Sequence, residues 1–247
     1  MDFIKDFDCI YENGIDKKTT KQYEGMFTQG SGYMHIRGSY EEGILAEPQN
    51  EEYMRMPANV TLEKAHNTRS KFGTYIPGIT GNHPLLNEEL VNLPFPFSIS
   101  LYVDNERFDV DECNVTEHKR WLDFKDGVLY RHFVWNTESG VKIVAEYRRF
   151  VSRYNPNIAY WQGNISSDKT CKLYVEDTIF NDVKTNGYNH FKETESRPGY
   201  CRVVTDTNEE VVISSEIHSN KAEFYSSNGK TVMNTDVSEE GITIRHE

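Results

Sequence analysis

From Pro96 to the end of the chain, short runs rich in Val, Ile, Tyr, Phe and Thr are separated by Gly, Asn and Asp. This pattern is typical of β-strands joined by turns. We predict strands at 97–103, 106–110, 127–135, 141–151, 157–166, 171–180, 199–206, 210–217, 220–226, 230–235 and 241–246. So many closely spaced strands indicate an all-β fold, either a sandwich or a barrel.

The clearest alternation lies at 141–151. Period-two spacing places one apolar set on a single face, namely Val141, Ile143, Ala145 and Tyr147. The charged set on the other face is Lys142, Glu146 and Arg148. Turn-forming residues at 136–140 separate this run from 128–135, so the two runs predict an antiparallel hairpin.

Helix signals are scarce, because only 18–26 and 61–68 could form a few turns and neither has a sustained apolar stripe. A wound α/β fold is therefore disfavoured. Residues 41–95 are irregular and rich in proline, and a long ordered loop in a compact domain is usually functional or an interaction element. We expect residues 1–247 to form a single β-sandwich domain.

The formal net charge of -12 disfavours nucleic acid as a partner, since binding the phosphate backbone needs a basic face. A membrane partner is disfavoured as well, because no apolar run approaches the roughly 20 residues that span a bilayer. Residues 1–8 lack the basic start and apolar stretch of a secretory signal, which predicts a cytoplasmic location. The glycosylation patterns at Asn59, Asn114 and Asn164 are then interpreted as chance matches.

No metal or cofactor site is predicted. The four cysteines lie far apart without a Cys-x-x-Cys pair, the eight histidines are dispersed, and we expect reduced thiols at Cys9, Cys113, Cys171 and Cys201. The glycines of Gly30-Ser31-Gly32 lack the context of a dinucleotide site, so this motif predicts a tight turn into a strand. No Gly-x-Ser-x-Gly elbow is present, and we assign no catalytic residue.

Acidic pairs are plentiful, and glycoside hydrolysis needs two carboxylates at a set separation. They occur at Glu41 and Glu42, Glu88 and Glu89, Asp109 and Asp111, and Glu209 and Glu210. Because most lie in turn-like or polar contexts, we interpret them as solvated acids. The segment 109–112 also lacks the remaining oxygen ligands of a calcium loop.

Aromatic side chains offer a second kind of site, because sugar rings stack on exposed aromatic faces. Trp135 and Trp161 sit in strand patterns and are predicted to belong to the core, whereas the position of Trp121 stays open.

Several segments, in order, resemble the amino-terminal domain of glycoside hydrolase family 65. Residues 23–38 (YEGMFTQGSGYMHIRG) are similar to the family's opening pattern E-x-x-F-x-x-G-N-G-Y-x-G-x-R-G, and Glu41-Glu42-Gly43 follows at the expected place. Residues 73–78 (GTYIPG), 89–94 (ELVNLP), 122–131 (LDFKDGVLYR) and 146–152 (EYRRFVS) match further segments. Ser31 replaces the usual Asn and His35 the usual Gly, which indicates a divergent branch.

The resemblance implies a large antiparallel β-sandwich of the galactose-mutarotase-like type. In the family this domain is joined to an (α/α)6 barrel that holds the general-acid Glu and the sugar and phosphate sites, and nothing in residues 1–247 resembles that barrel. We therefore expect a non-catalytic scaffold domain, excised from a longer inverting phosphorylase or hydrolase.

The implied partners are the barrel of the same chain, a second copy in a homodimer and, for the whole enzyme, an α-linked glucose disaccharide and phosphate. If part of the chain reaches the active-site rim, residues 70–95 are the first place to look. Two alternatives stay open: a stand-alone carbohydrate-binding module, which needs exposed aromatic faces, and a self-sufficient hydrolase, which needs two convergent carboxylates.

Overall fold

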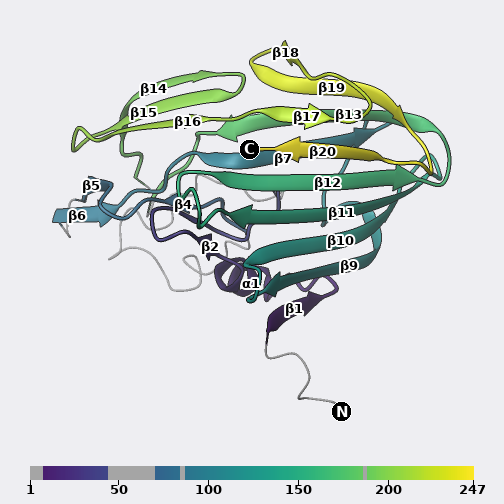
Figure 1. Ribbon diagram of the computed structural model, residues 1–247, viewed down its shortest axis with the longest axis horizontal. Coiled ribbons are helices and arrows are strands. Elements are labelled where there is room, and N and C mark those ends of the chain that lie inside the picture. The colour runs from purple at the N-terminus through teal and green to yellow at the C-terminus, as the bar shows by residue number, and fades with distance from the viewer. Residues whose placement is uncertain (1–7, 44–69, 84–86, 186–187) are drawn as a thin grey trace.

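The protein is described by a computed structural model that places residues 8–43, 70–83, 87–185 and 188–247. Its largest element is a seven-stranded antiparallel sheet, which Figure 1 shows from β17 and β20 down to β1. The strands in sheet order are β1 (Cys9–Asn13), β9 (Asn114–Asp123), β10 (Val128–Asn136), β11 (Lys142–Val151), β12 (Ala159–Ser167), β20 (Ile242–His246) and β17 (Ile217–Ser219).

A five-stranded sheet packs against the seven-stranded one. Its strands in order are β18 (Tyr225–Ser227), β19 (Lys230–Val237), β13 (Cys171–Phe180), β7 (Phe95–Val103) and β8 (Glu106–Arg107). The main core cluster joins Leu101 and Val175 of this sheet to Phe133 and Ile143 of the other. In β7 every second side chain is buried, as expected of a strand with one face on the core. The predicted all-β antiparallel sandwich is confirmed.

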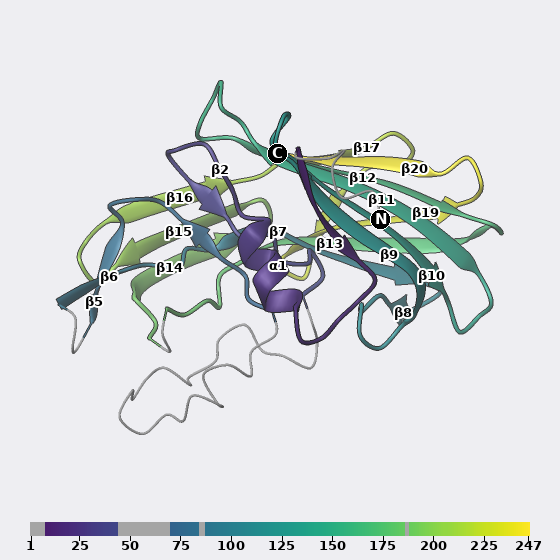
Figure 2. The ribbon, with the colours of Figure 1, turned by 90° about the horizontal axis from the view of Figure 1, so that it is seen from below.

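Three small sheets complete the described fold. They consist of β14 (Phe191–Arg197), β15 (Tyr200–Thr205) and β16 (Glu210–Ser214); of β2 (Gln29–Gly30), β3 (His35–Ile36) and β4 (Thr74–Tyr75); and of β5 (Thr80–His83) and β6 (Asn87–Leu90). Figure 2 shows β14–β16 and β5–β6 at the end of the molecule opposite the tips of β9 and β10.

Helical structure is confined, among the described residues, to α1 (Thr20–Met26), which lies within 18–26, one of the two stretches that could form a few helical turns. The helix predicted at 61–68 lies outside the described residues. No helix in the described part of the chain has the length and apolar character that crossing a membrane would require.

The predicted hairpin is present as β10 and β11, with Trp135 opposite Ile143 and Asn136 opposite Lys142. The apolar set of this hairpin strand is buried as predicted. Trp135 and Trp161 are fully buried, which confirms their place in the core.

Two long strands were missing from the prediction, β9 and β14, and so were the short strands before Pro96. Most positions of β9 and β14 are polar, so neither shows the apolar alternation on which strand prediction depends. The strand predicted at 220–226 was largely wrong, since only Tyr225 and Ser226 of that range fall in β18.

Candidate functional site

Three arginines point into the sandwich from three neighbouring strands of the seven-stranded sheet. Arg120 on β9 lies opposite Arg131 on β10, and Arg149 follows on β11. All three side chains are almost completely buried. Burying a guanidinium costs several kcal/mol unless anions and further hydrogen bonds compensate, so the segments that cover these arginines must supply carboxylates.

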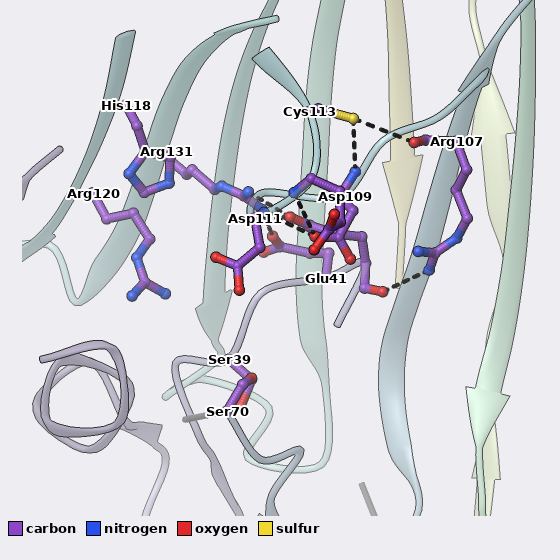
Figure 3. A network of polar contacts seen from close by, with 12 residues as sticks. Ser39, Glu41, Ser70, Arg107, Asp109, Asp111, Cys113, His118, Arg120 and Arg131 are labelled. Carbon is purple, nitrogen blue, oxygen red and sulfur yellow. Dashed lines mark hydrogen bonds and ion pairs between the residues drawn. The ribbon is translucent and has the colours of Figure 1, made fainter. Parts of the chain in front are cut away.

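The carboxylates come from the family-like segment that follows β3. Arg131 Nη1 and Nη2 donate to the two oxygens of Glu42 at 2.7 and 2.6 Å, a two-point ion pair. Arg131 Nη1 also donates to Glu41 at 2.9 Å, and the other oxygen of Glu41 lies 3.6 Å from Arg149 Nη1. On β1, Glu12 accepts from Arg120 Nε at 2.5 Å. Figure 3 shows Arg131 directed at Glu41, with Arg107 on the far side of the carboxylates.

Tyr40 lies between two of the arginines. The guanidinium carbons of Arg120 and Arg131 are 4.1 and 4.6 Å from the centre of its ring, within cation–π range. Burial raises the pKa of Tyr40 to about 12, so the phenol stays neutral and its ring serves as a stacking surface.

Helix α1 is tied to the same region through Glu24. This buried carboxylate accepts from Ser70 Oγ at 2.5 Å, from the Lys71 backbone N–H at 3.0 Å and from Arg37 Nε at 3.3 Å. Burial raises the pKa of Glu24, while Arg37 lowers it. The network therefore holds α1, residues 37–42 and residues 70–71 together on the inner face of the sheet.

The interpretation of the acidic pairs as solvated was wrong for five members of the pairs, whose side chains are buried: Glu41, Glu42, Glu89, Asp109 and Asp111. Arginines far away in the sequence neutralise Glu41 and Glu42, and a local sequence pattern does not reveal such partners. Asp109 instead closes a turn, since its Oδ1 accepts from the backbone N–H groups of Asp111 and Glu112. Of the remaining members, Glu88 and Glu210 are exposed and Glu209 is half-buried.

A second polar cluster, centred on His190, was not visible in the sequence. His190 Nε2 lies 2.9 Å from Glu89 and Nδ1 lies 3.2 Å from Asp206. Glu89 lies on β6, within a family-like segment, and Asp206 lies in the loop after β15, so His190 joins these two parts of the chain. Gly81 fits against the histidine because a Cβ there would lie 2.4 Å from His190 Nδ1.

The Gly-x-Gly motif forms the tight turn predicted for it, between β2 and β3. Gly32 has φ +88°, a conformation that favours glycine, and Ser31 Oγ donates to the Pro156 carbonyl at 2.9 Å. A Cβ at Gly30 would lie 2.4 Å from Nδ1 of His35, one of the two departures from the family pattern.

Two clefts open on the surface of the domain, and the first of them borders the buried network at Glu42. The first, of about 580 Å³, lies on the outer face of the five-stranded sheet and is bordered by Glu42, Gly43 and Arg107. The second, of about 670 Å³, has a mixed lining. Its exposed apolar side chains are Tyr33, Ile158 and Val212, with exposures of 46%, 39% and 51%, and its polar residues include Ser214 and Glu216. Residues of the 70–95 stretch border both clefts, Phe72 the first and Ile76 and Leu93 the second.

Trp121 lies on the outer face of the seven-stranded sheet. Its ring stacks on Tyr130 with 5.0 Å between centroids, and Lys119 Nζ lies 5.4 Å from its centre. Because these neighbours cover the ring, Trp121 does not present the open face that stacking on a sugar requires.

Within the described residues, no group of three or more His, Cys, Asp or Glu side chains is arranged to hold a metal ion. The four cysteines are free thiols. Each buried glutamate of the network contacts an arginine. This arrangement is suited to fixing segments in place, because each ion pair ties together parts of the chain that are far apart in the sequence.

The fold and the network together define a large antiparallel β-sandwich with a family-like segment anchored in its interior. The sequence model described as Glycosyl hydrolase family 65, N-terminal domain, matches residues 10–246, so the chain belongs to this family.

Curated relatives include a kojibiose phosphorylase of Caldanaerobacter subterraneus subsp. tengcongensis, 31% identical over 146 residues, which are 59% of this chain and 16% of that protein. A kojibiose phosphorylase of Halothermothrix orenii is 25% identical over 189 residues, 76% of this chain and 21% of that protein. An alpha,alpha-trehalose phosphorylase of Thermoanaerobacter brockii is 26% identical over 161 residues, 61% and 18% of the two chains. The matched region thus spans about a fifth of each relative.

The same fold occurs in a solved structure, the "Putative kojibiose phosphorylase from human microbiome". It aligns with a TM-score of 0.72 at 18% identity, over 96% of this chain and 32% of that chain.

Proposed function

We propose that this chain is the non-catalytic amino-terminal scaffold domain of an inverting disaccharide phosphorylase or hydrolase that acts on an α-linked glucoside. The catalytic barrel belongs to the same longer polypeptide, which works in the cytoplasm on a disaccharide and phosphate as a homodimer. Family membership and the names of the relatives, all disaccharide phosphorylases, support this assignment.

The observation that carries the proposal is how four of the buried carboxylates are used. Glu12, Glu24, Glu41 and Glu42 are all engaged with arginines. Glycoside cleavage by two carboxylates needs both to face one bond with an open space between them. The family-like residues Glu41 and Glu42 are instead enclosed, which favours a structural role over the alternative of a self-sufficient hydrolase.

The exposed apolar side chains of the second cleft support a docking role. Tyr33 lies in the family-like opening segment, and with Ile158 and Val212 it forms an apolar surface that a soluble domain usually keeps small or covers with a partner. We propose that the catalytic barrel packs on this surface.

The docking role can be tested in the longer polypeptide. Val212→Asp places a charge in the proposed interface and should lower both the melting temperature of the barrel and the rate of disaccharide phosphorolysis. The control is Phe124→Asp, an exposed aromatic residue in the turn between β9 and β10. Equal behaviour of the two variants, with neither property reduced, would contradict docking at this surface.

A further inference from the structure

The proposed function assigns no role to the first cleft. Its floor is the outer face of β7 and β13, and its rims are the turns between β14 and β15 and between β18 and β19. Clefts that take small ligands measure about 300–1,000 Å³, and this one measures about 580 Å³. It therefore has room for a small organic molecule.

The charged side chains that face this cleft are mostly cationic. Two carboxylates of residues on its border point into the interior instead, because Glu42 pairs with Arg131 and Asp177 is buried beside His246. Side chains alternate along β13, so Glu176, next to the buried Asp177, faces outward. Among the described lining residues, three cations and one carboxylate remain on the side of the cleft, a net charge of +2: Arg107, Arg197, Lys230 and Glu176.

Arg107 is held in place on the floor without a carboxylate partner among the described residues. Its Nη2 donates to the Glu42 carbonyl at 2.8 Å and to Ser100 Oγ at 3.2 Å (Figure 3). Its Nη1 makes no hydrogen bond to the part of the chain that the structure describes. Because a charge that is partly removed from water is costly unless an opposite charge compensates it, an anion in the cleft would stabilise this guanidinium.

The other two cations lie at the rims. Lys230 Nζ is 2.5 Å from Glu176 Oε2, so these two charges offset each other. The guanidinium carbon of Arg197 lies 4.1 Å from the centre of the Tyr200 ring, and its ion pair with Glu195 at 3.2 Å is exposed. Since an exposed ion pair contributes little, Arg197 stays available to a ligand. The two arginines therefore provide the net positive charge of the cleft.

The remaining lining suits a polar organic ligand. Phe72 and Phe180 add apolar surface beside the polar floor. Hydroxyl and amide groups, which bond readily to ligand hydroxyls, come from Ser98, Thr178, Asn181, Ser196 and Asn228. A guanidinium group binds phosphate through two parallel N–H donors, and a phosphate monoester carries about two negative charges at pH 7. Its charge thus matches that of the cleft.

We propose that this cleft binds the phosphate monoester of a small polar molecule, with Arg107 and Arg197 contacting the phosphate. The proposal does not rest on the scaffold role, because the cleft is built from side chains of this chain alone. It concerns binding and not turnover, so its failure and that of the proposed function are distinguished by different measurements.

The test is a titration of the 15N-labelled chain, followed by amide chemical shifts. The probes are glucose 1-phosphate, glucose 6-phosphate, inorganic phosphate, citrate and glucose. At least one sugar phosphate should give saturable shifts confined to β7, β8, β13 and the two rim turns, and should bind more than tenfold more tightly than glucose. Absence of such shifts with both sugar phosphates, or equal binding of glucose, would overturn the site. Tighter binding of citrate or inorganic phosphate than of both sugar phosphates would overturn the ligand class.

Two variants identify the contacts. Arg197→Gln removes a guanidinium from an exposed rim and should weaken binding of the sugar phosphate about tenfold. Arg107→Gln should weaken it by at least the same factor. The matched control is Arg148→Gln, which removes the same charge from an exposed position on β11 in the other sheet and should leave the affinity unchanged. Affinity equal to that of the control in a folded Arg197→Gln protein would overturn the assignment.

A third variant tests the sign of the ligand's charge. Glu176→Gln removes the carboxylate that faces the cleft and releases Lys230, so binding of the sugar phosphate should tighten about fivefold. A site that used Glu176 to hold ligand hydroxyls would lose affinity in the same variant. Weaker or unchanged binding by a folded Glu176→Gln protein would therefore overturn the proposal.

Discussion

At the scale of single residues, the main feature is a set of buried ion pairs between distant parts of the chain. Glu42 and Arg131 are 89 residues apart and form a two-point contact in the interior. Such a pair adds little stability over an apolar pair, but removing Glu42 leaves the buried Arg131 with only its single carboxylate contact to Glu41.

Glu42→Gln should therefore destabilise the domain by about 3–5 kcal/mol, because Arg131 loses its two-point partner in a dry environment. Chemical denaturation of the variant measures the change. Glu210→Gln, which removes an exposed carboxylate paired with Arg202, serves as the control and should change stability little. If Glu42→Gln and Glu210→Gln have the same free energy of unfolding, the prediction is contradicted, because water would then solvate Arg131 in place of the lost carboxylate.

His118 gives the domain a pH dependence. Burial, with help from Arg131 and Arg120, lowers the pKa of His118 from 6.5 to about 2, so the folded protein holds it neutral. Below pH 6.5 the unfolded chain binds a proton that the folded chain does not, and stability falls as pH falls. The loss is about 2 kcal/mol between pH 6.5 and about pH 5.

His118→Asn keeps a donor for the Gly14 carbonyl, which His118 Nδ1 contacts at 3.1 Å, but does not titrate. Denaturation curves measured between these pH values should show a smaller pH dependence for this variant than for the parent protein. Identical slopes would show that His118 is not held neutral by the fold.

At the scale of elements, the close packing of α1 against the segment after β3 depends on one glycine. A Cβ at Gly38 would lie 2.3 Å from the Cβ of Phe27, with backbone atoms of Phe27 at 3.0 Å. Phe27, which follows the helix, therefore packs directly against the backbone of Gly38, and there is no room for a side chain at position 38.

Gly38→Ala should destabilise the domain by about 1–3 kcal/mol, the range of overpacking in a filled interior. Gly25→Ala, within α1, is the matched control, since the nearest atom to its added Cβ would be 3.7 Å away. Alanine favours helix, so the control should be neutral or slightly stabilising. If both variants melt alike, the helix and the segment are not in close contact.

The strands that could be predicted are those with one apolar face, such as β7, β11 and β13, because alternation is a local property of the sequence. β9 could not be predicted, since its inward positions include His118 and Arg120, whose burial depends on Glu12, Gly14 and Gly38 in other segments. The buried ion-pair network could not be predicted for the same reason. In the sequence Glu41 and Glu42 resemble solvated acids, and only the fold places their arginine partners beside them. Likewise, Tyr33 gave no local signal that it would border a cleft as an exposed aromatic side chain.

At the scale of the whole molecule, two sheets enclose a core, the network anchors the family-like segments within it, and the two clefts lie outside. This distribution fits a domain that holds other parts of a longer enzyme. Each relative extends well beyond the region that this chain matches.

The central claim is that the chain is a scaffold and not a catalyst. The most direct measurement incubates the purified chain with kojibiose, nigerose, maltose and trehalose, with and without phosphate, and follows glucose and glucose 1-phosphate. The kojibiose phosphorylase of Caldanaerobacter subterraneus subsp. tengcongensis serves as the positive control for the assay. The account predicts no release of either product above the protein-free rate. Release that is sustained and proportional to the amount of chain would contradict it.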